Sequence, residues 1–197
     1  MKHAALGVQM HSGWGVLVAV STDPLEVLGR RRIVTAALDT PGAVQPYHFA
    51  ARLAVSEQEK HLADCAASSS RLAAAAIAEF TGELEARQNS VVGAAVLAAS
   101  GRALPSLEKI LAAHALIHTA EGEFFRHTVR IAFADLKIPV VVIRERELGG
   151  RARLVLGERA DPLEQAIEAM GRAIGPPWTK DHKSAALAAA LVSAGYR

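Results

Sequence analysis

Three ionisable side chains share one face of an expected helix in the segment HALIHTAEGEFFR, residues 114–126. At 100° per residue, His114, His118 and Glu121 fall on one stripe. Imidazole nitrogens and a carboxylate oxygen one turn apart could bind a transition metal. Ala115, however, stands where the zinc-protease motif H-E-x-x-H needs its glutamate. A divalent metal held by His114, His118 and Glu121 is therefore one hypothesis for this segment, although not the favoured one.

Glu121 lies at the margin of the apolar face of that helix, where a carboxylate loses hydration and must find a partner or take up a proton. One interpretation makes Glu121 and His118 a pair that transfers protons or anchors a ligand. The favoured interpretation is a buried polar network that holds the helix against a sheet. Glu123, Arg126 and His127 are expected to project to the opposite, solvated side.

The segment WTKDHK, residues 178–183, is the second candidate site. Asp181 is expected to be the N-cap of the last helix, with Ser184 three residues further on. Lys180 and Lys183 flank this helix start and would also suit a phosphate group. Both interpretations stay open at this point, and the structural one is favoured.

Two shorter segments complete the candidates for ligand binding. The tripeptide at 100–102 follows a predicted buried strand, at the edge where open α/β sheets usually bind ligands, so Arg102 is a candidate. The tripeptide is too short to be a phosphate-loop signature. Ser12 is a further candidate and has His11 beside it, but no G-x-S-x-G elbow surrounds it, which disfavours a serine hydrolase.

The spacing of apolar residues and turn signals predicts the elements that position these groups. An antiparallel three-strand meander opens the chain, and two buried strands follow. Those two strands should be parallel, because a helix crosses between them. The predicted strands are 4–10, 14–20, 25–37, 91–99 and 138–143, and the predicted helices are 56–80, 106–136 with a break near 114–122, 161–174 and 181–195. This order predicts one α/β domain over residues 1–197, with a mixed five-stranded sheet flanked by helices.

Local signals set the expected ends of several elements. Ser56 with Glu59 matches a capping box, and Thr81–Gly82 is expected to end the helix that Ser56 begins. Asp161, which stands before a proline, is expected to be an N-cap. Residues 144–153, which include two glycines, are expected to form a connector.

Composition limits the classes of protein that fit. The 22 basic and 20 acidic residues give a net charge of +2, so charge alone does not predict a nucleic-acid partner. Cys65 is the single cysteine, which excludes an intramolecular disulfide, and it is expected to be buried. No apolar run reaches the length of about 18–20 residues that a membrane span needs. A soluble, cytoplasmic protein without a membrane partner is expected.

The element order resembles the RNase H-like superfamily, and short stretches resemble its bacterial Holliday-junction resolvases. Residues 6–13, LGVQMHSG, are similar to their first strand and turn, where an Asp stands at the position of Gln9. Residues 180–188 are similar to the terminal helix that carries their last catalytic acid, here Asp181. A sharper likeness, of HALIHTAEGEFFR and GPPWTKDHK, is to a family of bacterial proteins of uncharacterised activity, and it implies no reaction.

The resolvase resemblance implies a two-metal nuclease, but the residues depart from that pattern. Two-metal phosphodiester chemistry needs several carboxylates that converge on the ions. Residues 4–20 and 90–107 contain no Asp or Glu, so only Asp181 stands at a matching position. One carboxylate, Gln9 and waters would hold a metal weakly. A two-metal nuclease is therefore disfavoured, and no cofactor is assigned.

Two functional hypotheses remain. The first is a non-nuclease RNase H-like binding or interaction module whose ligand is a nucleotide, a nucleic acid or a protein. The second is a hydrolase that uses Glu121, His118 and Asp181, with or without one divalent metal. The resemblance also implies a homodimer, and it implies one cleft shared by Gln9, Arg102, Asp181 and Glu121.

Overall fold

A five-stranded mixed sheet forms the centre of the computed structural model, which describes residues 2–99 and 103–196. Arg102 lies outside the described residues. The antiparallel meander consists of β1 (Lys2–His11), β2 (Trp14–Thr22) and β3 (Leu25–Val34). β4 (Asn89–Ala98) pairs in parallel with β1, and β5 (Val140–Arg144) pairs in parallel with β4. The strand order is β3-β2-β1-β4-β5, so the predicted fold class and the predicted edge position of β3 are confirmed.

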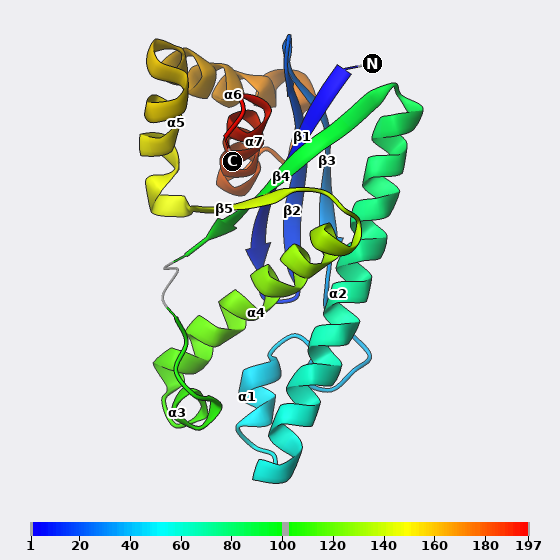
Figure 1. The fold of residues 1–197 in the computed structure, drawn as a ribbon, viewed down its shortest axis with the longest axis vertical. Coiled ribbons are helices and arrows are strands. Elements are labelled where there is room, and N and C mark those ends of the chain that lie inside the picture. The colour runs from blue at the N-terminus through cyan, green and yellow to red at the C-terminus, as the bar shows by residue number, and fades with distance from the viewer. Residues whose placement is uncertain (1, 100–102, 197) are drawn as a thin grey trace.

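Helices cover both faces of this sheet. α2 (Val55–Ala86) and α4 (His114–Asp135) lie on one face. α5 (Leu148–Leu156), α6 (Ala160–Ile174) and α7 (Lys180–Ser193) lie on the other (Figure 1). Short elements join them: α1 (Pro46–Ala50), α3 (Leu107–Leu111) and the 3₁₀ turns η1 (Glu145–Glu147) and η2 (Gly157–Arg159). Among the described residues, no helix has both the length and the apolar character to cross a membrane.

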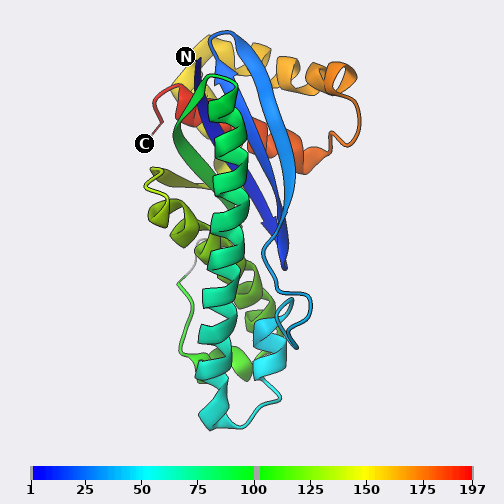
Figure 2. The ribbon, with the colours of Figure 1, turned by 90° about the vertical axis from the view of Figure 1, so that its right-hand side faces the viewer.

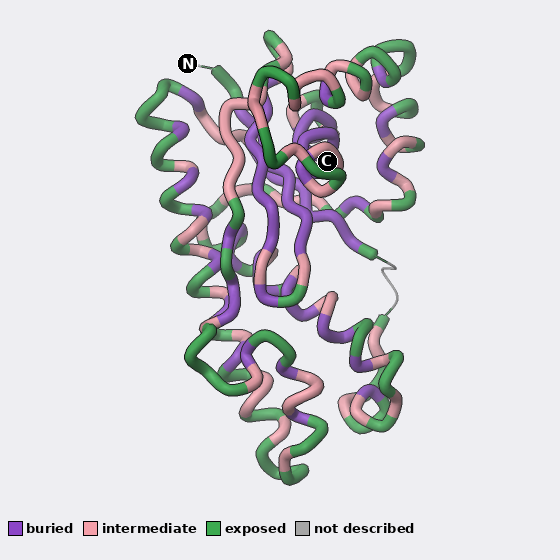
Figure 3. Tube along the Cα trace, turned by 180° about the vertical axis from the view of Figure 1, so that it is seen from behind, coloured by how far each residue is buried: buried purple, intermediate pink, exposed green. Residues whose placement is uncertain are grey.

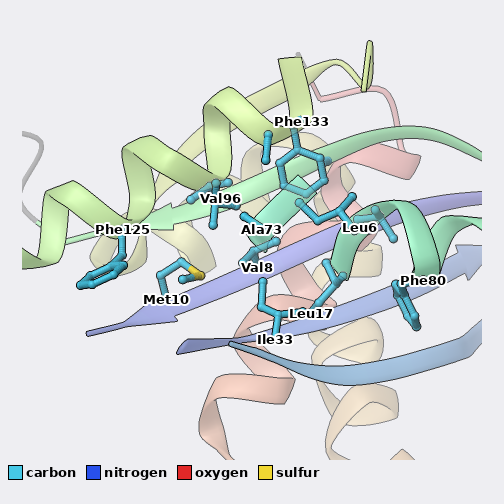
Figure 4. Packing of buried hydrophobic residues seen from close by; sticks show 14 of the residues in the cluster. Leu6, Val8, Met10, Leu17, Ile33, Ala73, Phe80, Val96, Phe125 and Phe133 are labelled. Carbon is cyan, nitrogen blue, oxygen red and sulfur yellow. The ribbon is translucent and has the colours of Figure 1, made fainter. Parts of the chain in front are cut away.

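The alternation of side chains along the strands divides the core into two layers. Leu6, Val8 and Met10 of β1 point to the α2 and α4 side, where they meet Phe125 and Phe133 (Figure 4). The intervening positions of the strands point to the α7 side, as a period of two requires. The sheet thus separates the residues of α4 from those of α7.

Beyond the sheet, the long α2 continues into a second, smaller group of helices. α1 packs beside the N-terminal half of α2, and α3 packs against α4 and α1 (Figures 1 and 2). Their own apolar cluster is small and is built on Ile110, Ile117 and Ala120. Buried residues concentrate in the sheet and thin out in this helical end (Figure 3).

α7 lies directly against the middle of the sheet because both surfaces carry small side chains. Five alanines between Ala185 and Ala190 are fully buried. A Cβ at Gly7 of β1 would overlap the backbone carbonyl of Ala185. Glycine is therefore required at position 7 for this close approach.

Several expected element ends are wrong. Thr81–Gly82 does not end α2, because one exposed glycine costs about 1 kcal/mol while Leu84 beyond it is buried in the core. Ala54 is the N-cap of α2, so the Ser56–Glu59 capping box does not form. β3 ends at Val34, three residues before the expected end.

The predictions for residues 144–181 also need correction. Most of the expected connector is helical, in η1 and α5, because Leu148 and Ala152 pack into the core against α7. Asp161 lies in the first turn of α6 and is not its N-cap. Thr179, not Asp181, is the N-cap of α7, and it shares a capping box with His182.

Candidate functional site

Polar groups gather at the edge of the sheet where the three parallel strands end. Gln9 and His11 come at the end of β1, and Glu145 directly follows β5. α7 begins beside them, so Asp181 reaches His11, with 2.9 Å between Oδ2 and Nε2. Lys180 Nζ lies 2.9 Å from Glu145 Oε1. The carboxyl ends of parallel strands are where open α/β sheets bind ligands, so this edge is the first candidate site.

Both carboxylates at this edge already have partners. Asp181 has the His11 imidazole, and Glu145 has the Lys180 ammonium. Gln9 Nε2 donates a long hydrogen bond of 3.4 Å to Glu145 Oε2. The hydrogen bond to Glu145 raises the pKa of Lys180. Gln9 Oε1 is buried and has no partner among the described residues.

The ring of Trp14 lies at the same edge, in contact with the side chains of His11 and Arg32. The Trp14 ring stacks on His11, with 4.4 Å between ring centroids and 18° between planes. Arg32 Cζ lies 4.5 Å from the Trp14 ring. The hairpin register pairs Trp14 with His11, which explains why these rings meet. A groove of about 460 Å³ runs beside them and reaches Lys180 and Asp181.

The arginines of β3 divide between the two faces of the sheet. Arg31 points to α2, where its guanidinium lies 3.1 Å from Glu79 and 2.6 Å from Glu83. Arg30 points to the α7 side and donates hydrogen bonds to four consecutive carbonyls of the α6–α7 connection, those of residues 174–177. Arg32 lies against the Trp14 ring and forms no ion pair with the described residues. Arg32 is therefore the arginine of this group that a ligand could recruit.

Arg30→Lys should lower the free energy of unfolding by about 1–2 kcal/mol, because an ammonium group cannot reproduce the forked contact with four carbonyls. Urea denaturation measures this difference. The matched control is Arg32→Lys on the same strand, which should stay within about 0.5 kcal/mol of the wild type. Equal effects at the two positions would contradict the structural role of Arg30.

The second candidate site lies around Glu121 on α4. Its Oε1 atom accepts hydrogen bonds from the backbone N–H groups of Tyr47 at 2.9 Å and His48 at 3.0 Å. The His48 Nδ1 atom lies 3.1 Å from the same oxygen. Burial raises the pKa of Glu121, and the hydrogen bonds from His48 and Tyr47 act in the opposite direction. The predicted burial of this carboxylate is confirmed, since only 3% of the residue is exposed.

The partner of Glu121 differs from the one that sequence reasoning proposed. Glu121 bonds with His48 of α1, whereas His118 joins a group of three histidines. His48, His114 and His118 each offer a ring nitrogen, and these atoms all lie within 4.8 Å of one another. Their ring centroids are 4.4–5.4 Å apart. His48 was missed because it lies between the predicted strand 25–37 and the predicted helix 56–80, where no helical pattern places it.

The candidates Glu121 and Asp181 were expected to share one cleft, and the described residues do not bring them together. Glu121 and Asp181 stand on helices that cover opposite faces of the sheet and have different partners, so the described residues place them in separate sites. Ser12 is exposed in the β1–β2 turn. Lys183 pairs with Glu168 of α6 at 2.5 Å. The roles proposed for these residues stay predictions.

Arg126 is not on a solvated face, contrary to expectation. It is half-buried, and its Nε donates to the Leu97 carbonyl at 3.1 Å. Burial lowers the pKa of its guanidinium, while Glu123 and Glu145 act against that shift. Leu97 stands near the end of β4, and its carbonyl lies within reach of Arg126 on α4. His127 is exposed, as predicted.

The comparison with known proteins finds matches among solved structures. No protein-family model matches the chain, and no curated protein matches it. A solved structure of Thermus thermophilus RuvC in complex with a Holliday junction substrate is similar over 98% of this chain and 93% of that chain, with 10% identity and a TM-score of 0.54. A second Thermus thermophilus RuvC structure is similar over 97% and 93%, with 12% identity and a TM-score of 0.51.

The chain has the RNase H-like fold. At the carboxyl edge of this sheet, the described ends of β1 and β4 carry no carboxylate. β1 presents the amide of Gln9, and the described end of β4 is alanine. Among the described residues, the group of three side chains placed so that they could together hold a metal ion is His48, His114 and His118, at the other site. The edge therefore offers cations, an aromatic ring and two acids that each have a side-chain partner.

Proposed function

We propose that this protein binds nucleic acid at the carboxyl edge of its sheet and does not cleave it. The observation that carries the proposal is the arrangement of His11, Trp14 and Arg32 beside the groove. Aromatic rings that stack on bases and cations that contact phosphates are the common means of holding nucleic acid. Arg32 supplies such a cation, and the Trp14 ring, which stacks on His11 and contacts Arg32, positions it at the surface.

The acids at the same edge support the absence of cleavage. Asp181 is hydrogen-bonded to His11, and Glu145 is ion-paired with Lys180. A pair of metal ions would need several ionised carboxylates aimed at the same point. These two carboxylates provide fewer negative charges than a two-metal site needs, and both already have partners. Gln9 of β1 adds an uncharged amide. A phosphate backbone suits such an edge better than two divalent ions do.

The structural relative supports the choice of ligand. Thermus thermophilus RuvC was solved with a Holliday junction substrate, and this chain matches it over nearly its whole length. We therefore choose DNA, in duplex or branched form, over a free nucleotide or a protein ligand.

Fluorescence anisotropy with a labelled duplex and a labelled four-way junction tests the proposal. We expect binding that weakens steeply with salt, with dissociation constants of about 10⁻⁴ to 10⁻⁶ M for non-specific contacts. Arg32→Ala should weaken binding and reduce the salt slope by about one, because one phosphate contact is lost. The matched control is Arg71→Ala, which removes an exposed arginine of α2 on the other side of the sheet.

Two outcomes would contradict the proposal in different ways. If neither DNA binds at low salt, or if Arg71→Ala weakens binding as much as Arg32→Ala does, the edge is not the binding site. If the four-way junction is cut in the presence of Mg²⁺ or Mn²⁺, and Asp181→Asn abolishes the cutting, the protein is a nuclease.

A further inference from the structure

Three imidazole groups from two separate elements converge at the helical end of the molecule, on the α4 side of the sheet. His114 and His118 stand one turn apart on α4 and are exposed, and His48 approaches them from α1. We propose that His48, His114 and His118 bind one divalent transition-metal ion, with zinc as the expected ion. The proposal does not depend on DNA binding.

The spacing of the nitrogens fits a tetrahedral ion after a small adjustment. With zinc–nitrogen bonds of about 2.0–2.1 Å, ligand nitrogens stand about 3.3–3.4 Å apart. The three ring nitrogens lie within 4.8 Å of one another, so they need to close by at most about 1.5 Å. His114 and His118 are exposed and can turn toward the ion by rotation of their side chains. His48 is more enclosed, with 17% of its side chain exposed, and provides the fixed position.

Glu121 orients the enclosed ligand. Its Oε1 atom lies 3.1 Å from His48 Nδ1, so the carboxylate is placed to accept a hydrogen bond from an imidazole N–H at Nδ1. His48 Nε2 then keeps its lone pair for a metal. Histidine ligands in metal sites usually donate their other N–H to a carboxylate, which holds the ring and increases its basicity. The same oxygen also binds the N–H groups of Tyr47 and His48, so the carboxylate itself is held in place.

The donor set selects the class of ion. Three neutral imidazoles suit zinc, copper or nickel, whereas calcium and magnesium prefer oxygen ligands. Three protein ligands leave the fourth tetrahedral position open to water or to a small ligand. Cys65 lies 3.6 Å from His61 and is not part of the three-histidine group, so no thiolate enters the site.

Cobalt is a suitable probe, because tetrahedral Co²⁺ absorbs visible light and zinc can then displace it. The full chain should bind one equivalent of Co²⁺ with the spectrum of a tetrahedral ion, and Zn²⁺ should abolish the absorption. His114→Ala and His118→Ala should each weaken binding at least about tenfold, the lower end of the losses found around metal sites. His127→Ala is the matched control, since His127 is an exposed histidine of the same helix outside the group. Its affinity should equal that of the wild type.

His48→Ala decides whether the site has three ligands or two. If His48 binds the ion, the variant loses about tenfold or more in affinity and the tetrahedral spectrum. Glu121→Gln should bind Co²⁺ about 10–100-fold more weakly while it keeps the same spectrum, because the ligands remain and only their orientation suffers.

Three results would overturn the proposal. They are the absence of a Co²⁺ spectrum in the wild type, unchanged affinity in His48→Ala, and equal losses in His127→Ala and His114→Ala. If His48→Ala does not fold, ¹⁵N NMR of the wild-type imidazoles replaces it. Zinc should then shift the ring nitrogens of His48, His114 and His118, and a shift confined to His114 and His118 would refute the three-histidine site.

Discussion

Gly7→Ala should lower the free energy of unfolding by about 3 kcal/mol, the upper end of the usual cost of overpacking a core. The added methyl group would overlap the backbone carbonyl oxygen of Ala185, and backbone cannot move aside as the end of a flexible side chain can. α7 would have to shift away from β1. Because buried alanines fill the rest of this interface, such a shift would also open space along the helix.

Urea denaturation of the wild type and of Gly7→Ala measures this cost. Gly82→Ala is the matched control, since a Cβ at this exposed position of α2 meets no atom within 4 Å. That substitution should increase stability by up to about 1 kcal/mol, because alanine favours the helix. If the two glycine variants have the same stability, α7 does not pack on β1 as described.

Glu121→Leu should lower the free energy of unfolding by about 2 kcal/mol or more, because each buried donor left without an acceptor costs about 1–3 kcal/mol. The donors concerned are the N–H groups of Tyr47 and His48, which both use Glu121 Oε1. Relief from burying a carboxylate offsets part of the loss. Glu123→Leu is the matched control on the same helix. Its weak contact with Arg130, at 4.0 Å, predicts a change below about 1 kcal/mol.

The contribution of Glu121 should also depend on pH. Burial raises its pKa above the ordinary value of 4.5, so the folded protein binds this proton more tightly than the unfolded chain does. The stabilisation linked to that proton is complete below pH 4.5 and is lost as the pH rises through the raised pKa. The wild type should therefore lose stability relative to Glu121→Gln over that range. The check is the free energy of unfolding of both proteins from about pH 4 to about pH 8.

His48 faces Glu121 and carries a titratable imidazole of its own, so the comparison needs a second background. The same pair of proteins carrying His48→Gln separates the carboxyl titration from that of the imidazole. If the stability difference between the protein with Glu121 and its Glu121→Gln variant does not change with pH in either background, the pKa of this carboxyl is not raised.

The sheet could be predicted because its signals are local. The apolar run at 91–99 and the meander at 4–37 carry strand periodicity in the chain itself, and the crossing helix requires β4 and β5 to be parallel. Helix starts were less predictable. Ser56, Asp161 and Asp181 all have the chemistry of an N-cap, yet the helices begin at other residues. Packing of the apolar faces decides where each helix begins, and the cap must then form at that residue.

In the two candidate sites, too, some features could be predicted from the sequence and others depend on the tertiary structure. Helical periodicity places His114, His118 and Glu121 on one stripe and puts Glu121 where its charge must be compensated, and the chain alone carries that information. The compensating partner, His48, stands 73 positions away in a five-residue helix, and no pattern in the sequence connects the two. Likewise, nothing local predicts that Lys180 reaches Glu145. Such pairs are chosen by the packing of distant elements, because a side chain's partners depend on the space around it and not on its neighbours in the chain.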